Sequence, residues 1–177
     1  MWSKASKSHV AHMTKGDFYA TEQSYILPKA NSVRIEFVNS EDKSVKILKE
    51  NFKLQEGEVI DASCMKAAEL RAFLKKEIAD AHKEQMLFSL HMKATMMKIS
   101  DPIIFGHAVT TFFEPVFEKY AAEFKDLGVN PNNGFNDLLI KINSLPEITK
   151  QQILADIDLC YESRPWLAMV SITHVFI

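Results

Sequence analysis

Two segments of the sequence gather lysines and histidines without any acidic residue. Residues 1–16 contain three lysines and two histidines, and residues 85–100 contain two lysines and one histidine. If the fold brings the two segments together, several ammonium groups can surround one anionic ligand, because a low local dielectric strengthens their attraction for it. The alternative is that these lysines are separate, solvated surface charges. The residues concerned are Lys4, Lys7, His9, His12, Lys15, His91, Lys93 and Lys98.

Asp101 is the acidic residue that follows the second of these segments. A carboxylate just before a helix that starts near Pro102 caps exposed backbone amides and interacts favourably with the helix dipole. The same place, just beyond a buried strand, is where α/β proteins gather ligands, and hard divalent cations take oxygen ligands. Capping and metal binding therefore both stay open, and one carboxylate does not make a magnesium site.

Other reactive side chains near the N-terminus form no recognisable catalytic pattern. His9 and His12 are three positions apart, which on a strand places them on opposite faces, so we expect a structural role and no shared metal. Ser6 and Ser8 lie near His9 but outside any nucleophile elbow, and no acid is recognisable that would orient the histidine.

The composition predicts a globular cytoplasmic chain of one domain. A chain of 177 residues with 47% hydrophobic residues can bury a core without metals or disulfides. A net charge of −2 gives no general attraction for nucleic acid or anionic lipid. Cys64 and Cys160 fit no disulfide framework or zinc ribbon, and the five glycines form no nucleotide-binding loop. No segment resembles a signal peptide or a membrane span.

Strand patterns occur mainly in the first half of the chain. Val33, Ile35 and Phe37 alternate with charged residues, which predicts a strand with one half-buried face. A polar turn follows, and the alternation then resumes, so residues 32–49 should form an antiparallel hairpin. The remaining expected strands are a weak one within residues 3–13, a short one at 59–62, and one at 86–92 that is apolar enough to be buried on both faces.

Helix patterns dominate the second half. Ser63 is a plausible N-cap for an amphipathic helix whose inward positions are Leu70, Leu74, Ile78 and Ala81. A helix from about Pro102, capped by Asp101 or Ser100, should be kinked or split at Pro115. Two further helices fit residues 134–145 and 147–161, the second with Ile153 and Ile157 inward. The helix expected from about Pro102 carries an inward stripe of Ala108, Phe112, Val116, Tyr120 and Phe124.

The chain closes on the uncharged residues 166–177, WLAMVSITHVFI, which predict an apolar edge strand of a truncated protein. Strands mixed with helices, including one strand-helix-strand passage, predict an α/β fold with a mixed sheet and flanking helices.

Three long strings resemble the monomeric, NADP-dependent isocitrate dehydrogenases. They are WSKASKSHVAHMTKGDFY at residues 2–19, VIDAS at 59–63 and LFSLHMKATMMKISDPIIFGH at 87–107. The resemblance continues to about Val170, whereas SITHVFI at 171–177 departs from it. It implies that residues 1–170 are a single α/β fragment, one half of that family's large domain, with a divergent or truncated tail and an internal Met1.

The resemblance also implies an activity. The family catalyses oxidative decarboxylation of isocitrate to 2-oxoglutarate and CO2, a step of the tricarboxylic acid cycle, with NADP and Mg²⁺ or Mn²⁺. By resemblance, Lys7 in SKASKSHVAH matches the catalytic lysine and Asp101 in KISDPIIFGH one metal-binding aspartate. We expect the two to converge on one cleft.

The resemblance places the rest of the active site elsewhere. The other metal carboxylates, the isocitrate clamp, the partner tyrosine and the NADP site are expected in the remainder of the parent enzyme, so the chain alone should be inactive. The competing interpretation is a non-catalytic module in which the same lysines hold an anion or a partner protein.

Overall fold

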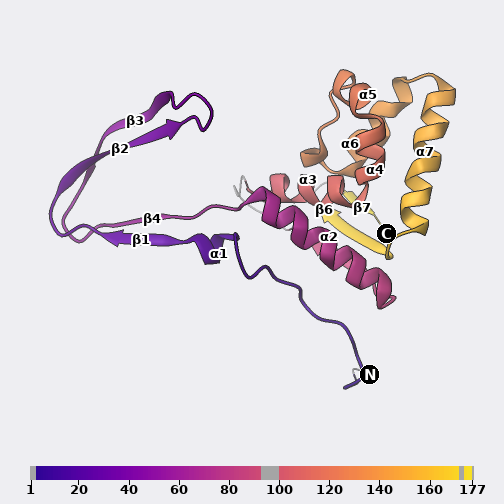
Figure 1. The fold of residues 1–177 in the computed structure, drawn as a ribbon, viewed down its shortest axis with the longest axis horizontal. Coiled ribbons are helices and arrows are strands. Elements are labelled where there is room, and N and C mark those ends of the chain that lie inside the picture. The colour runs from indigo at the N-terminus through magenta and orange to yellow at the C-terminus, as the bar shows by residue number, and fades with distance from the viewer. Residues whose placement is uncertain (1–2, 93–99, 172–173, 177) are drawn as a thin grey trace. The chain divides into compact units, whose positions relative to one another are not determined.

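Helices and strands are mixed along the chain in the computed structural model, which describes residues 3–92, 100–171 and 174–176 and confirms the α/β class (Figure 1). The chain divides into two compact units. We call Thr14–Met65 the strand unit, and Met1–Met13 together with Lys66–Ile177 the helical unit.

The strand unit consists of two antiparallel pairs of strands. Strands β2 and β3 form a hairpin that confirms the one expected at residues 32–49, and β4 confirms the strand expected at 59–62. The sequence patterns missed β1, which pairs with β4 from Gln23 opposite Ala62 to Ile26 opposite Val59. The elements are α1 (Phe18–Thr21), β1 (Gln23–Ile26), β2 (Asn31–Val38), β3 (Val45–Leu54) and β4 (Val59–Ala62).

The hydrophobic side chains of the strand unit are mostly exposed. Leu27 and Leu54 are its only buried hydrophobic side chains. The expectation of a half-buried face on β2 is therefore wrong for Ile35, which is 48% exposed, and for Phe37, which is 55% exposed. The physical reason is that each sheet of this unit has only two strands, so no second layer of the unit covers its faces.

The helical unit contains a three-stranded sheet in the order β5-β6-β7, with β5 parallel to β6 and β6 antiparallel to β7. The expectation that residues 86–92 are buried on both faces is wrong, because β5 is an edge strand whose residues are alternately half-buried and exposed. The expectation of an edge strand at residues 166–177 is also wrong for the first part of that segment, which forms the central strand β6. The elements are α2 (Ala67–Lys83), β5 (Phe88–His91), α3 (Ser100–Phe112), α4 (Glu114–Lys119), α5 (Ala121–Asp126), the 3-10 turn η1 (Pro131–Asn133), α6 (Phe135–Lys141), the 3-10 turn η2 (Ile142–Ser144), α7 (Glu147–Glu162), β6 (Leu167–Ser171) and β7 (His174–Phe176).

A cluster of aromatic rings lies in the core of the helical unit. Phe113 is fully buried, stacks on Phe135 with 4.1 Å between ring centroids, and meets Phe112 edge-on at 5.0 Å. The split expected at Pro115 is confirmed, because α3 ends at Phe112 and α4 begins at Glu114 with the proline in its first turn. Burial confirms all the inward positions expected on the helices, which are Leu70, Leu74, Ile78, Ala81, Ala108, Phe112, Val116, Tyr120, Phe124, Ile153 and Ile157.

Two expectations about the start of the chain and of α2 are wrong. Residues 3–13 form no strand, because their amides bond locally: the Ser6 N–H donates to the Ser3 carbonyl, and the Ser8 N–H donates to the Ser6 hydroxyl. Ser63 does not cap α2, whose N-cap position is Lys66. The preceding backbone is held by α1, because the Cys64 N–H donates to Thr21 Oγ1 at 2.9 Å.

Candidate functional site

Asp101 lies in the first turn of α3 and is partly exposed. The expectation that Asp101 or Ser100 caps the helix from outside is wrong, because α3 already begins at Ser100. The Ser100 hydroxyl lies 3.4 Å from Asp101 Oδ1, which is long for an O–H···O hydrogen bond. The carboxylate still benefits from the positive end of the helix dipole.

The position of Asp101 is fixed by the packing of α3 below it. Phe105, Ala108 and Val109 are buried in the core, and α3 packs against α2 and η1. The contact with η1 is close at Gly106, where an added Cβ would lie 2.0 Å from Asn132 Oδ1. A side chain at this position would force the Asn132 side chain to move, and the Asn132 backbone nitrogen would also lie close, at 3.1 Å from the added Cβ.

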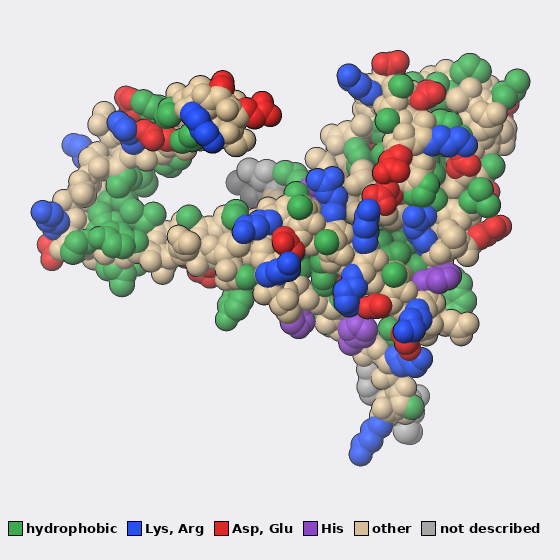
Figure 2. Space-filling model, viewed as in Figure 1, with side chains coloured by type: hydrophobic (Ala, Val, Ile, Leu, Met, Phe, Trp, Pro, Cys, Tyr) green, Lys and Arg blue, Asp and Glu red, His purple; other side chains and the backbone are tan. Residues whose placement is uncertain are grey.

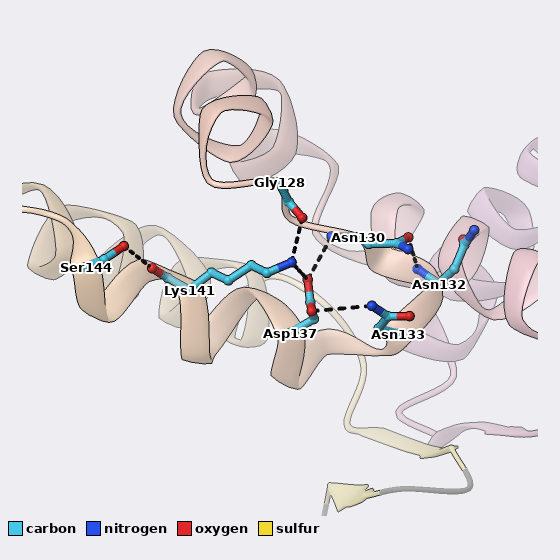
Figure 3. A network of polar contacts seen from close by, with 7 residues as sticks. All are labelled: Gly128, Asn130, Asn132, Asn133, Asp137, Lys141 and Ser144. Carbon is cyan, nitrogen blue, oxygen red and sulfur yellow. Dashed lines mark hydrogen bonds and ion pairs between the residues drawn. The ribbon is translucent and has the colours of Figure 1, made fainter.

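The turn η1 is in turn held by a polar network around Asp137 (Figure 3). Asp137 accepts hydrogen bonds from the Asn130 N–H and from Lys141 Nζ, each at 2.8 Å, and Lys141 also donates to the Gly128 carbonyl at 2.5 Å. Desolvation by itself raises the pKa of Asp137, but the Asn130 and Lys141 hydrogen bonds outweigh it and hold the pKa below its ordinary value. The network therefore joins α6 to the loop that supports α3.

Lys7 lies in the N-terminal segment of the helical unit and is exposed. Its ammonium forms an ion pair with Glu84, the C-cap residue directly after α2. The hydrogen bond from Lys7 lowers the pKa of the Glu84 carboxyl. The ring of His9 bends back onto the same segment, with Nδ1 2.9 Å from the Lys7 carbonyl oxygen.

The structure does not bring Lys7 and Asp101 into contact. Within the described part of the chain, Lys7 is paired with Glu84, and no hydrogen bond or ion pair joins it to Asp101. The convergence of the two residues on one cleft therefore stays a prediction. Of the second lysine-rich segment, His91 is exposed at the end of β5, whereas Lys93 and Lys98 lie outside the described residues.

Metal-ligating side chains do not gather in the described residues: no three of their His, Cys, Asp or Glu side chains could hold one ion. Asp101 supplies the oxygen donors that a hard cation prefers, as a partly exposed carboxylate in the first turn of α3. A metal site that includes Asp101 therefore stays a prediction.

One titratable group further along α3 was not singled out by the sequence patterns. His107 is half-buried, and burial together with the positive charge of Arg71 on α2 lowers its pKa. The imidazole is therefore neutral at pH 7. Its signal in the sequence is weak, because a histidine on a helix reveals neither its depth nor its neighbours.

A cavity of about 300 Å³ lies between α2, the α3–α4 corner and the end of α7. Its charged lining includes Arg164 and the ion pair of Lys75 with Glu114, whose closest atoms are 2.7 Å apart. Neither Lys7 nor Asp101 lines it. Sequence patterns could not have found this cavity, because its walls come from three distant segments.

No helix in the described ranges has both the length and the hydropathy needed to cross a bilayer.

Comparison with known proteins covers nearly the whole chain. A family model described as monomeric isocitrate dehydrogenase matches residues 1–175. Isocitrate dehydrogenase [NADP] 2 of Colwellia maris is 50% identical over 169 residues, and the protein of the same name from Mycobacterium tuberculosis is 48% identical over 169 residues. Isocitrate dehydrogenase [NADP] of Azotobacter vinelandii is 46% identical over 170 residues. In each case the match covers 96% of this chain but only 23% of the relative.

Proposed function

The chain belongs to the monomeric isocitrate dehydrogenase family, and from this premise we propose that it forms part of an enzyme that oxidises and decarboxylates isocitrate with NADP. The observation that carries the proposal is the match of residues 1–175 to the family, at 46–50% identity to three NADP-dependent relatives. In this role the chain contributes Lys7 and Asp101 to a composite site in the cytoplasm, with the remaining groups on the rest of the enzyme.

Asp101 is proposed as one carboxylate ligand of Mg²⁺ or Mn²⁺. Its exposure and its place on a helix anchored by the aromatic core support this role, because a metal ligand must be accessible and rigidly held. A divalent cation bound there supplies Lewis-acid stabilisation of negative charge on the substrate oxygens. The positive end of α3 adds to the attraction for the carboxylates of isocitrate.

Lys7 is proposed as the residue that holds and passes a proton at the substrate hydroxyl and at the carbon left after CO2 departs. An exposed lysine on a segment without regular structure can reposition when the rest of the enzyme is present. This requires its ammonium to leave Glu84, which is feasible because an exposed ion pair contributes little stability. Asp101 and Lys7 then have separate tasks, one at the metal and one at the proton.

The chain alone should not catalyse the reaction. No three metal-ligating side chains gather in the described residues, so Asp101 has no partners there to complete a cation site, and the glycine-rich signatures of nucleotide binding are absent from the sequence. Titration of the 177-residue chain with isocitrate, Mg²⁺ and NADP is therefore expected to give no NADPH.

The proposal is tested in the Azotobacter vinelandii relative with its matched segment replaced by the corresponding residues of this chain. We expect isocitrate- and Mg²⁺-dependent NADPH formation, measured by absorbance. Lys7→Met should lower kcat by about 10²–10⁴-fold. Asp101→Asn should raise the Mg²⁺ concentration needed for half-maximal rate by more than about tenfold, because loss of a direct ligand should cost more than loss of a residue that only supports a ligand.

Two matched controls separate these effects from a general loss of charge. Lys29→Met and Asp126→Asn replace an exposed lysine and an exposed aspartate elsewhere and should leave both parameters unchanged. A folded chimera that forms no NADPH, or one in which Lys7→Met is as active as Lys29→Met, would contradict the proposal.

A further inference from the structure

The hairpin of β2 and β3 carries hydrophobic side chains on both faces and buries few of them. Figure 2 shows such side chains gathered over the strand unit. Single exposed hydrophobic residues are common on proteins, but a contiguous group marks an interaction surface. On the two strands the exposed members are Ile35, Phe37, Val38, Val45, Ile47, Leu48 and Phe52, each at least 40% exposed.

The strand register divides most of these residues between the two faces. Val33, Ile35 and Phe37 alternate along β2 and share one face, and Phe52 joins them because it lies opposite Val33. We call these four residues the apolar face. The other side of the sheet carries Val38 opposite Val45 and Ile47 opposite Glu36.

Two lysines border the apolar face. Lys46 lies opposite Phe37 and Lys49 opposite Ile35, so both belong to the same side of the sheet. The Lys49 ammonium lies 4.3 Å from the centre of the Phe52 ring. A surface that covers this face should be apolar at its centre and carry carboxylates where it meets the two lysines.

The strand unit also lacks the burial that would stabilise it independently. Its buried hydrophobic side chains, Leu27 and Leu54, lie where β1 has just ended and where β3 ends. Two-stranded sheets are at best marginally stable in water without packing on another layer. The hairpin therefore needs a second surface to hold it.

We propose that the β2–β3 hairpin is a docking surface for the part of the enzyme's own polypeptide that lies outside this chain. That part should cover the hairpin with an apolar patch edged by carboxylates. This inference rests on the proposed function. The family is described as monomeric, so a second subunit is not the expected cover. The matched segment is only 23% of the relatives, so more than three quarters of each polypeptide remains to supply that surface.

Hydrogen exchange of residues 31–54 tests the inference, read by mass spectrometry in the 177-residue chain and in the full-length Azotobacter chimera. We expect rapid exchange in the chain alone and at least about 100-fold slower exchange in the chimera. Ile35→Ser with Phe37→Ser should remove about 30-fold or more of that protection, since both side chains lose apolar burial. The control pair Glu41→Ser with Glu50→Ser changes exposed polar positions of the same hairpin and should leave the protection intact.

Three outcomes decide the inference separately from the proposed function. Protection in the chimera without NADPH formation would support the docking surface and reject the function. Equal exchange in the chain and the chimera, with NADPH formed, would overturn the docking surface alone. Slow exchange in the isolated chain would also overturn it, because a second copy or the chain's own helical unit would then cover the hairpin. Concentration dependence of that protection distinguishes these two covers.

Discussion

Replacement of Asp137 by alanine should destabilise the helical unit by about 2 kcal/mol. The carboxylate accepts from the Asn130 N–H at 2.8 Å and from Lys141 Nζ at 2.8 Å, while its contact with Asn133 is long at 3.5 Å. A hydrogen bond to a charged group contributes about 1.5–3 kcal/mol, and an i,i+4 ion pair about 0.3–0.5 kcal/mol. Because the network is partly exposed to solvent, the expected loss lies near the lower end of the sum of these two contributions.

The measurement is the free energy of unfolding of the 177-residue chain in urea, followed by circular dichroism at pH 7. Asp137→Asn keeps an oxygen for the Asn130 N–H and should lose about half as much as Asp137→Ala. Asp126→Ala, at an exposed position ending α5, should stay within about 0.5 kcal/mol of the parent.

The pH dependence of the stability difference tests the role of the Asp137 carboxylate independently. The folded state holds the pKa of Asp137 below its ordinary value of 3.8, so the carboxylate's contribution is present above that value and fades as the pH falls through the folded pKa. The difference between the parent and Asp137→Ala should therefore shrink in acid. A penalty under 0.5 kcal/mol at pH 7, or one that does not shrink in acid, would refute the reasoning.

Three further predictions concern α3 and the core. Gly106→Ala should destabilise the chain by about 1–2 kcal/mol despite the better helix propensity of alanine, because an added Cβ would lie 2.0 Å from Asn132 Oδ1. Asn132→Ala should recover much of this loss in the double variant. An equal penalty for Gly106→Ala with and without the Asn132 side chain would contradict the clash. The folded state lowers the pKa of His107, so the neutral imidazole stabilises the fold above about pH 6.5, and that stabilisation is lost as the pH falls through the folded pKa. His107→Gln should therefore flatten the pH dependence of the unfolding free energy, measured in urea, between pH 7 and pH 5. An unchanged slope would contradict this prediction. Phe113→Ala should lose about 3–5 kcal/mol of unfolding free energy, because the side chain is fully buried and stacked on Phe135, and a loss below about 1 kcal/mol would place the core elsewhere.

The helical unit was largely predictable from local patterns. Spacing of three or four placed Leu70, Leu74 and Ile78 inward, and burial confirms them because one face of α2 packs on the core. The division at Pro115 followed from the missing amide donor of proline. These predictions succeeded because each depends on chemistry within a few residues of the chain.

Features that depend on distant partners could not be predicted in the same way. The pattern of residues 3–13 suggested a strand, but a strand needs a neighbour, and serine side chains satisfied these amides instead. The alternation of Ile35 and Phe37 identified a strand correctly and its burial wrongly, because alternation does not reveal whether a second layer is present. For the same reason the sequence could nominate Lys7 and Asp101 for one site but could not place them together.

The central claim is that Lys7 and Asp101 reach one ligand when the rest of the enzyme is present. The most direct measurement is the NMR signal of the isotopically methylated Lys7 ammonium in the full-length chimera during titration with Mn²⁺ and isocitrate. The signal is assigned by its loss in Lys7→Arg. Strong paramagnetic broadening that disappears in Asp101→Asn is the predicted result. A Lys7 signal that stays sharp at saturating Mn²⁺ would contradict the claim.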